Sequence, residues 1–350
     1  MSLYNKRVNR FRIGWLGATL ALAATLLGAL CAHADTGTNL SIPVNNPPVV
    51  RVQMRSGNLV IRTWDRQQVQ ITASDPVVAT RFSPDAVERA LRGGDIPIFS
   101  TKVLTRDGEI ALPQEDFSIP TLTETPHDGV VVFGGDNGAN VTVTVPASTA
   151  LIWTMIGRGQ LHLQDYHSGA FVARVHTGII SLSNVSGDGY VEAARGAIAI
   201  RDSAFNRIRA RSAAGNILFA NCNARQIEVS SVEGSIAYDN GTFVPGLARF
   251  ETQNGDIALG IAGGGVQVGA HSGGGRVFSN FTRGADVRGN GTDAQATLNG
   301  GGPVVTATSQ HGDVYLYDGA FKSRPKLQRE WRPVGRMLKA RICAGRPCRV

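Results

Sequence analysis

The chain has little of what most enzymes and redox proteins depend on. Of its 350 residues only four are cysteines, aromatic residues make up 7% and charged residues 18%. So low a proportion of charge argues against extended disorder over most of the length. No Ser-His-Asp order, nucleotide-binding loop or Walker motif can be assembled from the sequence. We therefore expect an ordered protein that is not an enzyme and that has no cofactor.

Long apolar segments are also missing. An uncharged, mostly apolar run from Trp15 to Leu30 is too short to span a membrane comfortably. It follows a basic segment and precedes Ala32-His33-Ala34, which has the A-x-A form of a cleavage site. This pattern predicts a cleavable signal peptide at residues 1–34, with an uncleaved anchor as the alternative. The protein is therefore expected in the periplasm or at the cell surface.

Glycine, by contrast, is abundant, and it recurs in one motif: glycine, any residue, an apolar residue, any residue, an apolar residue. An example is Gly178-Ile179-Ile180-Ser181-Leu182. From Gly159 to Gly255 the intervals are 19, 18, 19, 19 and 21 residues, and Gly274 begins a weaker copy. A fixed period near twenty predicts a repeat protein whose units stack around one core. The structural repeat glycines are Gly57, Gly159, Gly178, Gly196, Gly215, Gly234, Gly255 and Gly312.

The motif also predicts how each unit is oriented. Its two apolar residues are two positions apart, so both side chains point to the same side of a strand. Stacked strands about 4.8 Å apart align these side chains in interior columns. The residues one and three after the glycine then point outward, and the glycines supply turns with positive φ or close backbone approach. The sequence predicts an all-β, elongated β-solenoid, similar to a parallel β-helix, of about ten short rungs.

We expect the solenoid over residues 49–321, after a Pro- and Asn-rich lead-in at residues 35–48. Residues 75–128 interrupt the period. Within them Ser83-Pro84-Asp85 is typical of the start of a helix, which Gly93-Gly94 would end. The remainder of this insertion is predicted to be a long loop over the side of the solenoid, either functional or a plain insertion.

Positive charge is concentrated at the two ends. The formal net charge is +8, yet the residues between the signal peptide and residue 322 carry 21 basic against 26 acidic side chains. The C-terminal tail, residues 322–350, has ten basic residues and one acidic residue. Such a tail would dock on an anionic surface, or it would be a solvated end. The predicted docking residues are Lys322, Arg324, Lys326, Arg329, Arg332, Arg336, Lys339 and Arg341.

Cysteine and histidine positions predict no metal site. Cys343 and Cys348 flank a turn in the tail, and we expect a disulfide between them in an oxidising compartment. Cys222 is expected to be a packed thiol. Stacking could align histidines into a metal site, but no cysteine or carboxylate column accompanies them, so we predict solvent-facing turn residues. These histidines are His176, His271 and His311.

Carboxylate positions matter because parallel β-helices also host polysaccharide lyases and hydrolases, whose sites need acids that converge on one face. The acidic residues of successive turns lie at different offsets from their glycines, which does not predict such a site. They are Asp188, Asp202, Asp239 and Asp256.

The order of these segments resembles a bacterial family. The strand segment Val52 to Asp65, then Val141-Thr142-Val143-Thr144-Val145-Pro146, the serial glycine repeats and the closing stretch Asn299 to Val314 resemble an uncharacterised "putative adhesin" group of exported proteins. The resemblance covers residues 49–74 and 130–319. It implies a β-strand repeat without catalytic residues to transfer.

Together these features predict an exported, non-enzymatic binding or structural surface of the cell envelope. Its partner would be an envelope glycan, an anionic lipid or another envelope protein, not nucleic acid, and contact would involve outward residues such as His162, Arg201 or Tyr315. Two alternatives stay open. One is a carbohydrate-active β-helix enzyme, and the other is an envelope assembly or stress accessory protein that pairs, or self-associates, through the edge strands of the solenoid.

Overall fold

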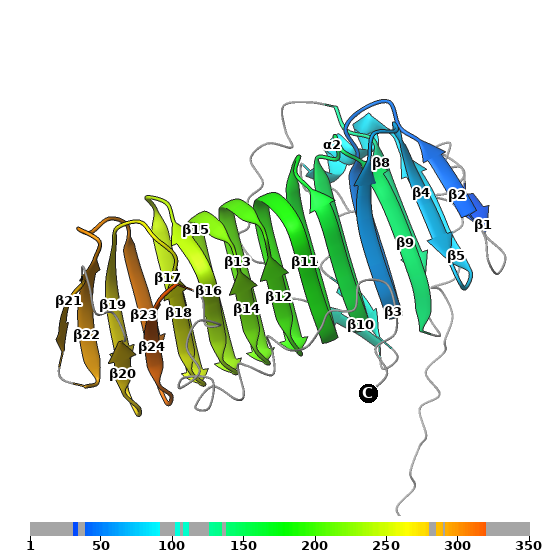
Figure 1. Ribbon diagram of the computed structural model, residues 1–350. Helices are drawn as coiled ribbons and strands as arrows, with labels where there is room; N and C mark the ends of the chain where they lie inside the picture. Colours follow the sequence, from blue (N-terminus) through cyan, green and yellow to red (C-terminus); the bar gives the residue numbers. More distant parts are fainter. Residues whose placement is uncertain are drawn as a thin grey trace, which may run out of the picture.

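The computed structural model describes residues 31–33, 39–91, 102–105, 108–111, 126–134, 138–279, 285–289 and 291–319. In these residues the protein is almost entirely β, with 22 strands in one continuous sheet that forms an elongated solenoid (Figure 1), which confirms the predicted fold class. None of the described helices has the length and apolar character needed to cross a membrane.

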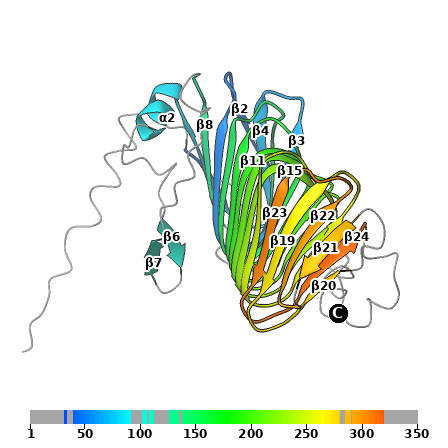
Figure 2. The same cartoon turned by 90° about the vertical axis from the view of Figure 1, so that its left-hand side faces the viewer.

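Each rung of the middle part contributes a strand to each of two faces. The first face contains β13 (Ala204–Ala214), β15 (Asn223–Glu233) and β17 (Leu247–Asn254), paired in parallel. The second face contains β12 (Ile198–Arg201), β14 (Ile217–Ala220), β16 (Ile236–Phe243) and β18 (Ile257–Ile261), also parallel. The long strands β3 (Val49–Trp64), β10 (Leu151–Tyr166) and β11 (Ala170–Arg195) run from one face onto the other. Figure 2 shows the two faces nearly end-on.

The apolar residues of the glycine motif form the predicted interior columns. Ile198, Ile217, Ile236 and Ile257 are directly in register along the second face, and all are buried. Tyr238 lies in the neighbouring column, where its hydroxyl shares its one proton between the carbonyl oxygens of Cys222 (2.9 Å) and Thr242 (3.0 Å). The core is therefore one continuous apolar interior along the rod, in which the buried Tyr238 hydroxyl is hydrogen-bonded.

The repeat glycines form a column at the corner between the two faces. Gly57, Gly159 and Gly178 are in register. The φ angles of Gly159 and Gly178 are 144° and 147°, a region open essentially to glycine alone. A Cβ on Gly159 would collide with the carbonyl oxygen of Gly57, and one on Gly178 would collide with that of Gly159. The glycines are thus required by both the backbone conformation and the close approach of successive rungs.

At the C-terminal end the rungs do not stack in sequence order, which corrects the prediction from the 19-residue period. The rung of β23 (Val304–Ser309) and β24 (Val314–Asp318) pairs directly with β17 and β18. The earlier segment with β19 (Val266–Ser272) and β20 (Val277–Ser279) lies outside it. The chain makes an out-and-back excursion there, in which β22 (Asp293–Leu298) pairs antiparallel with β19 and β21 (Ala285–Gly289).

The N-terminal end has the same kind of rearrangement. Strand β3 lies between β10 and the later segment β8 (Gly129–Gly134) with β9 (Ala139–Pro146). Antiparallel strands then close this end: β4 (Gln68–Ala73), β5 (Val77–Phe82), β2 (Asn39–Pro43) and β1 (Cys31–His33). Strand β2 falls in the predicted lead-in. The N-terminal end thus finishes in short antiparallel strands, as does the first face at the C-terminal end, whereas the second face ends there in the three-residue parallel strand β20; short edge strands are a known way to blunt sheet edges.

The insertion at residues 75–128 is more regular than the predicted long loop. Its first part is strand β5, whose alternating Val77 and Ala79 are buried against β8. The expected helix is α2 (Pro84–Leu91), and a hairpin follows with β6 (Lys102–Thr105) and β7 (Gly108–Ala111). In α2, Val87 packs with Val49 and Val131 on the outer side of the sheet. The insertion therefore covers the N-terminal part of the first face.

Candidate functional site

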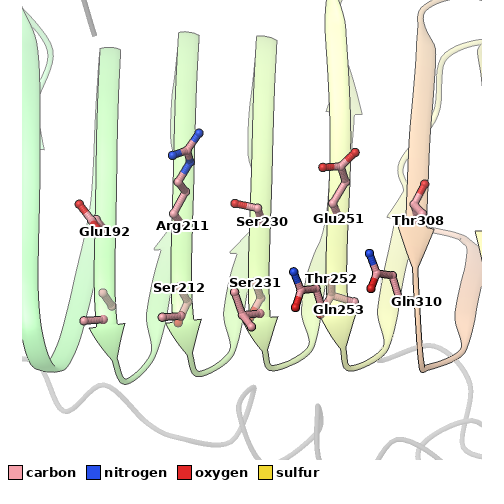
Figure 3. A pocket seen from close by; sticks show the side chains of 14 residues that line it. Glu192, Arg211, Ser212, Ser230, Ser231, Glu251, Thr252, Gln253, Thr308 and Gln310 are labelled. Atoms are coloured by element: carbon pink, nitrogen blue, oxygen red, sulfur yellow. The ribbon is translucent and has the colours of Figure 1, made fainter. Parts of the chain in front are cut away.

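The exposed part of the first face has a row of polar side chains that crosses five neighbouring strands. In register order the row contains Glu192 on β11, Arg211 on β13, Ser230 on β15, Glu251 on β17 and Thr308 on β23 (Figure 3). All five point outward, because the residues on either side of each one are buried. Parallel pairing therefore produces a straight polar row whose members are about 4.8 Å apart from strand to strand.

A groove runs beside this row, with a volume of about 510 Å³. The groove is open because Ala194, Ala213 and Ser230 have small side chains, and Gln253 and Gln310 line the rest of the groove. We call the groove and its polar row the ladder groove. Its lining combines carboxylate, guanidinium, hydroxyl and amide groups, and no aromatic side chain is among the described residues that line it.

A column of inward hydroxyl groups supports the edge of the ladder groove. The side chains of Ser231, Thr252 and Ser309 donate hydrogen bonds to the carbonyl oxygens of Gly215, Gly234 and Gly255, at 3.1, 2.8 and 2.8 Å. Each hydroxyl thus satisfies a carbonyl at the corner of the preceding rung. This column was not predicted, although a Ser or Thr three residues before a repeat glycine is a visible signal in the sequence.

Ion pairs hold the charged side chains of the first face in place. Glu192 accepts a hydrogen bond from the Tyr190 hydroxyl (3.1 Å) and pairs with Arg174, whose guanidinium lies over the Tyr190 ring. Because opposite charges alternate, the face has no strong net charge. The pairs are Arg174–Glu192, Arg207–Asp188, Arg209–Glu228 and Arg249–Glu251, with N–O distances of 3.2, 3.3, 3.0 and 3.2 Å.

The acidic residues that the sequence analysis weighed do not converge. Asp188 pairs with Arg207 on the first face, Asp202 accepts a hydrogen bond from Asn221 at a turn, and Asp239 lies buried on the second face. Asp256 accepts a hydrogen bond from the backbone N–H of Asp313 (2.8 Å). Burial raises the pKa of Asp256, and the nearby Asp313 carboxylate raises it further. Asp188, Asp202 and Asp256 thus each contact a neighbouring rung.

Comparison with known protein families shows which family the chain belongs to. The model described as Toastrack DUF4097 matches residues 114–317, more than half of the 350 residues. The chain belongs to the Toastrack DUF4097 family. A solved structure described as a putative cell adhesion protein from Clostridium sporogenes ATCC 15579 is 10% identical, with 81% of this chain and 100% of that chain covered and a TM-score of 0.21. No curated protein matches. This Toastrack membership is compatible with a binding or structural role and establishes no specific function.

The Toastrack solenoid also has an asparagine ladder that the sequence analysis did not find. Asn184 donates a side-chain hydrogen bond to Asp165 (2.7 Å), and Asn240 donates one to Asn221 (2.8 Å). These residues have φ near 50°, which Asn and Asp tolerate better than most residues. Their spacing of 18 or 19 residues was a readable signal. The members are Asp165, Asn184, Asp202, Asn221 and Asn240.

The three histidines predicted at turns, His176, His271 and His311, are exposed as expected, but His176 and His271 lie within strands β11 and β19, which corrects the prediction of turn positions. Among the described residues no group of three or more His, Cys, Asp or Glu side chains could hold a metal ion. Of the outward residues named as contacts, Arg201 is exposed and His162 half-buried, which lowers the pKa of His162. Tyr315 corrects the expectation, since it is only 9% exposed.

Several predicted sites lie outside the described residues. These are the signal peptide up to residue 30, the docking residues of the tail, and Cys343 with Cys348. Cys222 is inside the Toastrack solenoid as expected: its thiol is buried and free, and burial raises its pKa to about 11.

Proposed function

We propose that this Toastrack solenoid is an exported, non-enzymatic binding rod of the cell envelope. Its ladder groove would hold an extended, hydroxyl-rich ligand such as an envelope glycan. The observation that supports this proposal best is the in-register polar row from Glu192 to Thr308, beside a groove of about 510 Å³.

The chemistry of the groove favours a polar polymer of low charge. Glu192, Arg211 and Glu251 offer charged hydrogen-bonding groups whose charges nearly cancel. Gln253 and Gln310 offer both hydrogen-bond donors and acceptors. Strand spacing of about 4.8 Å is comparable with the length of one sugar unit in a linear glycan, so the groups can repeat with the ligand. Since the strands are fixed in the sheet, little conformational entropy would be lost on binding.

The spacing of carboxylates favours binding over glycoside hydrolysis. Glu192 and Glu251 are three strands apart, which separates their backbones by about 14 Å. Paired glycosidase carboxylates are only about 5–9.5 Å apart. Arg211 and Ser230 also stand between the two acids. The carbohydrate-active enzyme therefore has less support than a binding groove.

Binding of envelope glycans to the purified chain tests this proposal. We expect the double variant Arg211→Ala/Gln310→Ala to bind at least tenfold more weakly, because it removes a charged group and an amide from one groove. Arg62→Ala, which removes an exposed arginine from the second face, is the matched control and should bind like wild type. If all three proteins bind a glycan equally, or none binds any, the ladder groove is not the site.

We propose in addition that the basic tail docks the rod on anionic envelope components. Its support is the ten basic residues at positions 322–350. Near an anionic membrane each such residue contributes about 1 kcal/mol. Truncation at Ala320 should leave the rod folded and weaken its adsorption to vesicles that contain anionic lipid, most clearly at low salt. Unchanged adsorption after truncation would exclude this docking role.

A further inference from the structure

A patch on the second face is buried although its side chains point outward. Leu218, Ala237, Ala258 and Tyr315 occupy neighbouring strands in direct register. The residues on either side of them in the sequence, such as Ile236 and Ile257, belong to the interior core. The patch forms a separate apolar cluster that also contains Tyr317. We call these five residues the outer patch.

The burial of the outer patch requires a cover. Ala237 and Ala258 are 0% exposed, and Tyr317 is 4% exposed. A methyl group on the outside of a sheet is otherwise open to solvent, as it is at Ala213 on the first face, which is exposed. The described members of the cluster all come from β14, β16, β18 and β24 themselves, and no other described helix or strand belongs to it.

Aromatic rings extend the patch toward the end of the rod. The rings of Tyr315 and Tyr317 are nearly parallel, with centroids 6.5 Å apart, and the Phe278 ring stacks on Tyr315 at 5.0 Å. Phe278 is 43% exposed. Apolar surface of this kind favours an apolar partner, because covering it removes it from water.

We propose that the segment after Gly319, residues 320–350, which contains the C-terminal tail, packs its apolar side chains on the outer patch. The described chain ends at Gly319, directly after the strand that contains Tyr315 and Tyr317. The patch spans four strands, or about 15 Å between the outer ones. The 31 residues that follow could reach about 100 Å when extended, so reach is not limiting.

The composition of the tail matches the patch. Val334, Met337 and Leu338 recur at helical spacing and would form one apolar side, with Arg336 and Lys339 on another. Docked in this way, the tail would hold its basic side chains outward on the rod.

Trypsin cleavage of the full chain tests the docking, because seven of the ten basic residues of the tail are not followed by proline and can therefore be cleaved. Intact-mass measurements would follow the rate at which tail fragments are released. Ala258→Glu places a charge under the tail, and we expect at least tenfold faster release. Ala204→Glu makes the same change at an exposed position on the first face and should leave the rate unchanged. Equal rates in wild type and a folded Ala258→Glu variant would overturn the proposal.

A second measurement keeps the proposal testable if Ala258→Glu does not fold. A chain that ends at Gly319 should expose the outer patch and bind a dye for apolar surface several-fold more strongly than the full chain. Equal dye binding would overturn the proposal. Light scattering on the full chain would identify the other occupant: a stable dimer that persists after truncation, with no gain in dye binding, would mean that a second copy covers the patch.

Discussion

Replacing Gly196 with alanine should destabilise the solenoid strongly, because this residue belongs to the corner column. Its φ is 135°, and an added Cβ would collide with the carbonyl oxygen of Gly178 in the preceding rung. The strained backbone would cost about 1–3 kcal/mol. Forcing an extra methyl group into the packed corner would cost about 1–3 kcal/mol more. We therefore expect a loss of about 2–6 kcal/mol in the free energy of unfolding.

Urea denaturation followed by circular dichroism measures this loss. Gly269→Ala is the matched control, since Gly269 is also a strand glycine but an added Cβ there meets no atom within 4 Å. This control should change the free energy of unfolding by no more than about 0.5 kcal/mol. If Gly196→Ala unfolds at the same urea concentration as Gly269→Ala, the close approach of the glycine column does not constrain the fold.

Three further substitutions test other parts of the rod. Tyr238→Phe removes a buried hydroxyl that satisfies two carbonyl groups, and it should lower the free energy of unfolding by about 1–3 kcal/mol; no change in urea would mean that these bonds contribute nothing net. Asn221→Ala breaks the asparagine ladder on both sides and places alanine at a φ of 53°, so we expect a loss of about 2 kcal/mol, and an unchanged melting temperature would contradict this. Because burial raises the pKa of Asp256, the folded state holds its proton more tightly than the unfolded state does, and the charged form costs stability above that pKa. Asp256→Asn should therefore be more stable than wild type at pH 7, and this advantage should disappear as the pH falls below about 4; a constant difference across pH would refute it.

The fold could be predicted because the same residues satisfy local and global requirements. At Gly178 a positive φ, a tight corner and a close neighbour all demand glycine, and Ile180 and Leu182 after it must point inward. The order of the end rungs could not be predicted in this way. The segments that begin at Gly274 and Gly312 fit the period equally well, and only the antiparallel pairing of β22 with β19 decides which one lies next to Gly255.

The candidate site was less predictable than the core. Glu192, Arg211 and Glu251 are separated by 19 and 40 residues and share no sequence motif, so only the strand register reveals that they form a row. Outward positions tolerate many side chains, and the period therefore leaves no mark on them. The burial of Tyr315 could not be predicted for a related reason. The repeat period shows which residues stack on one another from rung to rung, but it does not show what covers the outer side of the stack.

At both ends of the rod the rungs do not stack in sequence order, and for this reason the rod can be lengthened only in its middle. Between Gly196 and Asn254, each unit of 19 to 21 residues pairs solely with the unit before and the unit after it. One duplicated unit there would lengthen the rod by about 4.8 Å and extend the ladder groove by one position. The same duplication beyond Gly255 would separate strands that must interleave. The length of a Toastrack solenoid of this type can thus change only in whole rungs, while its two ends stay the same.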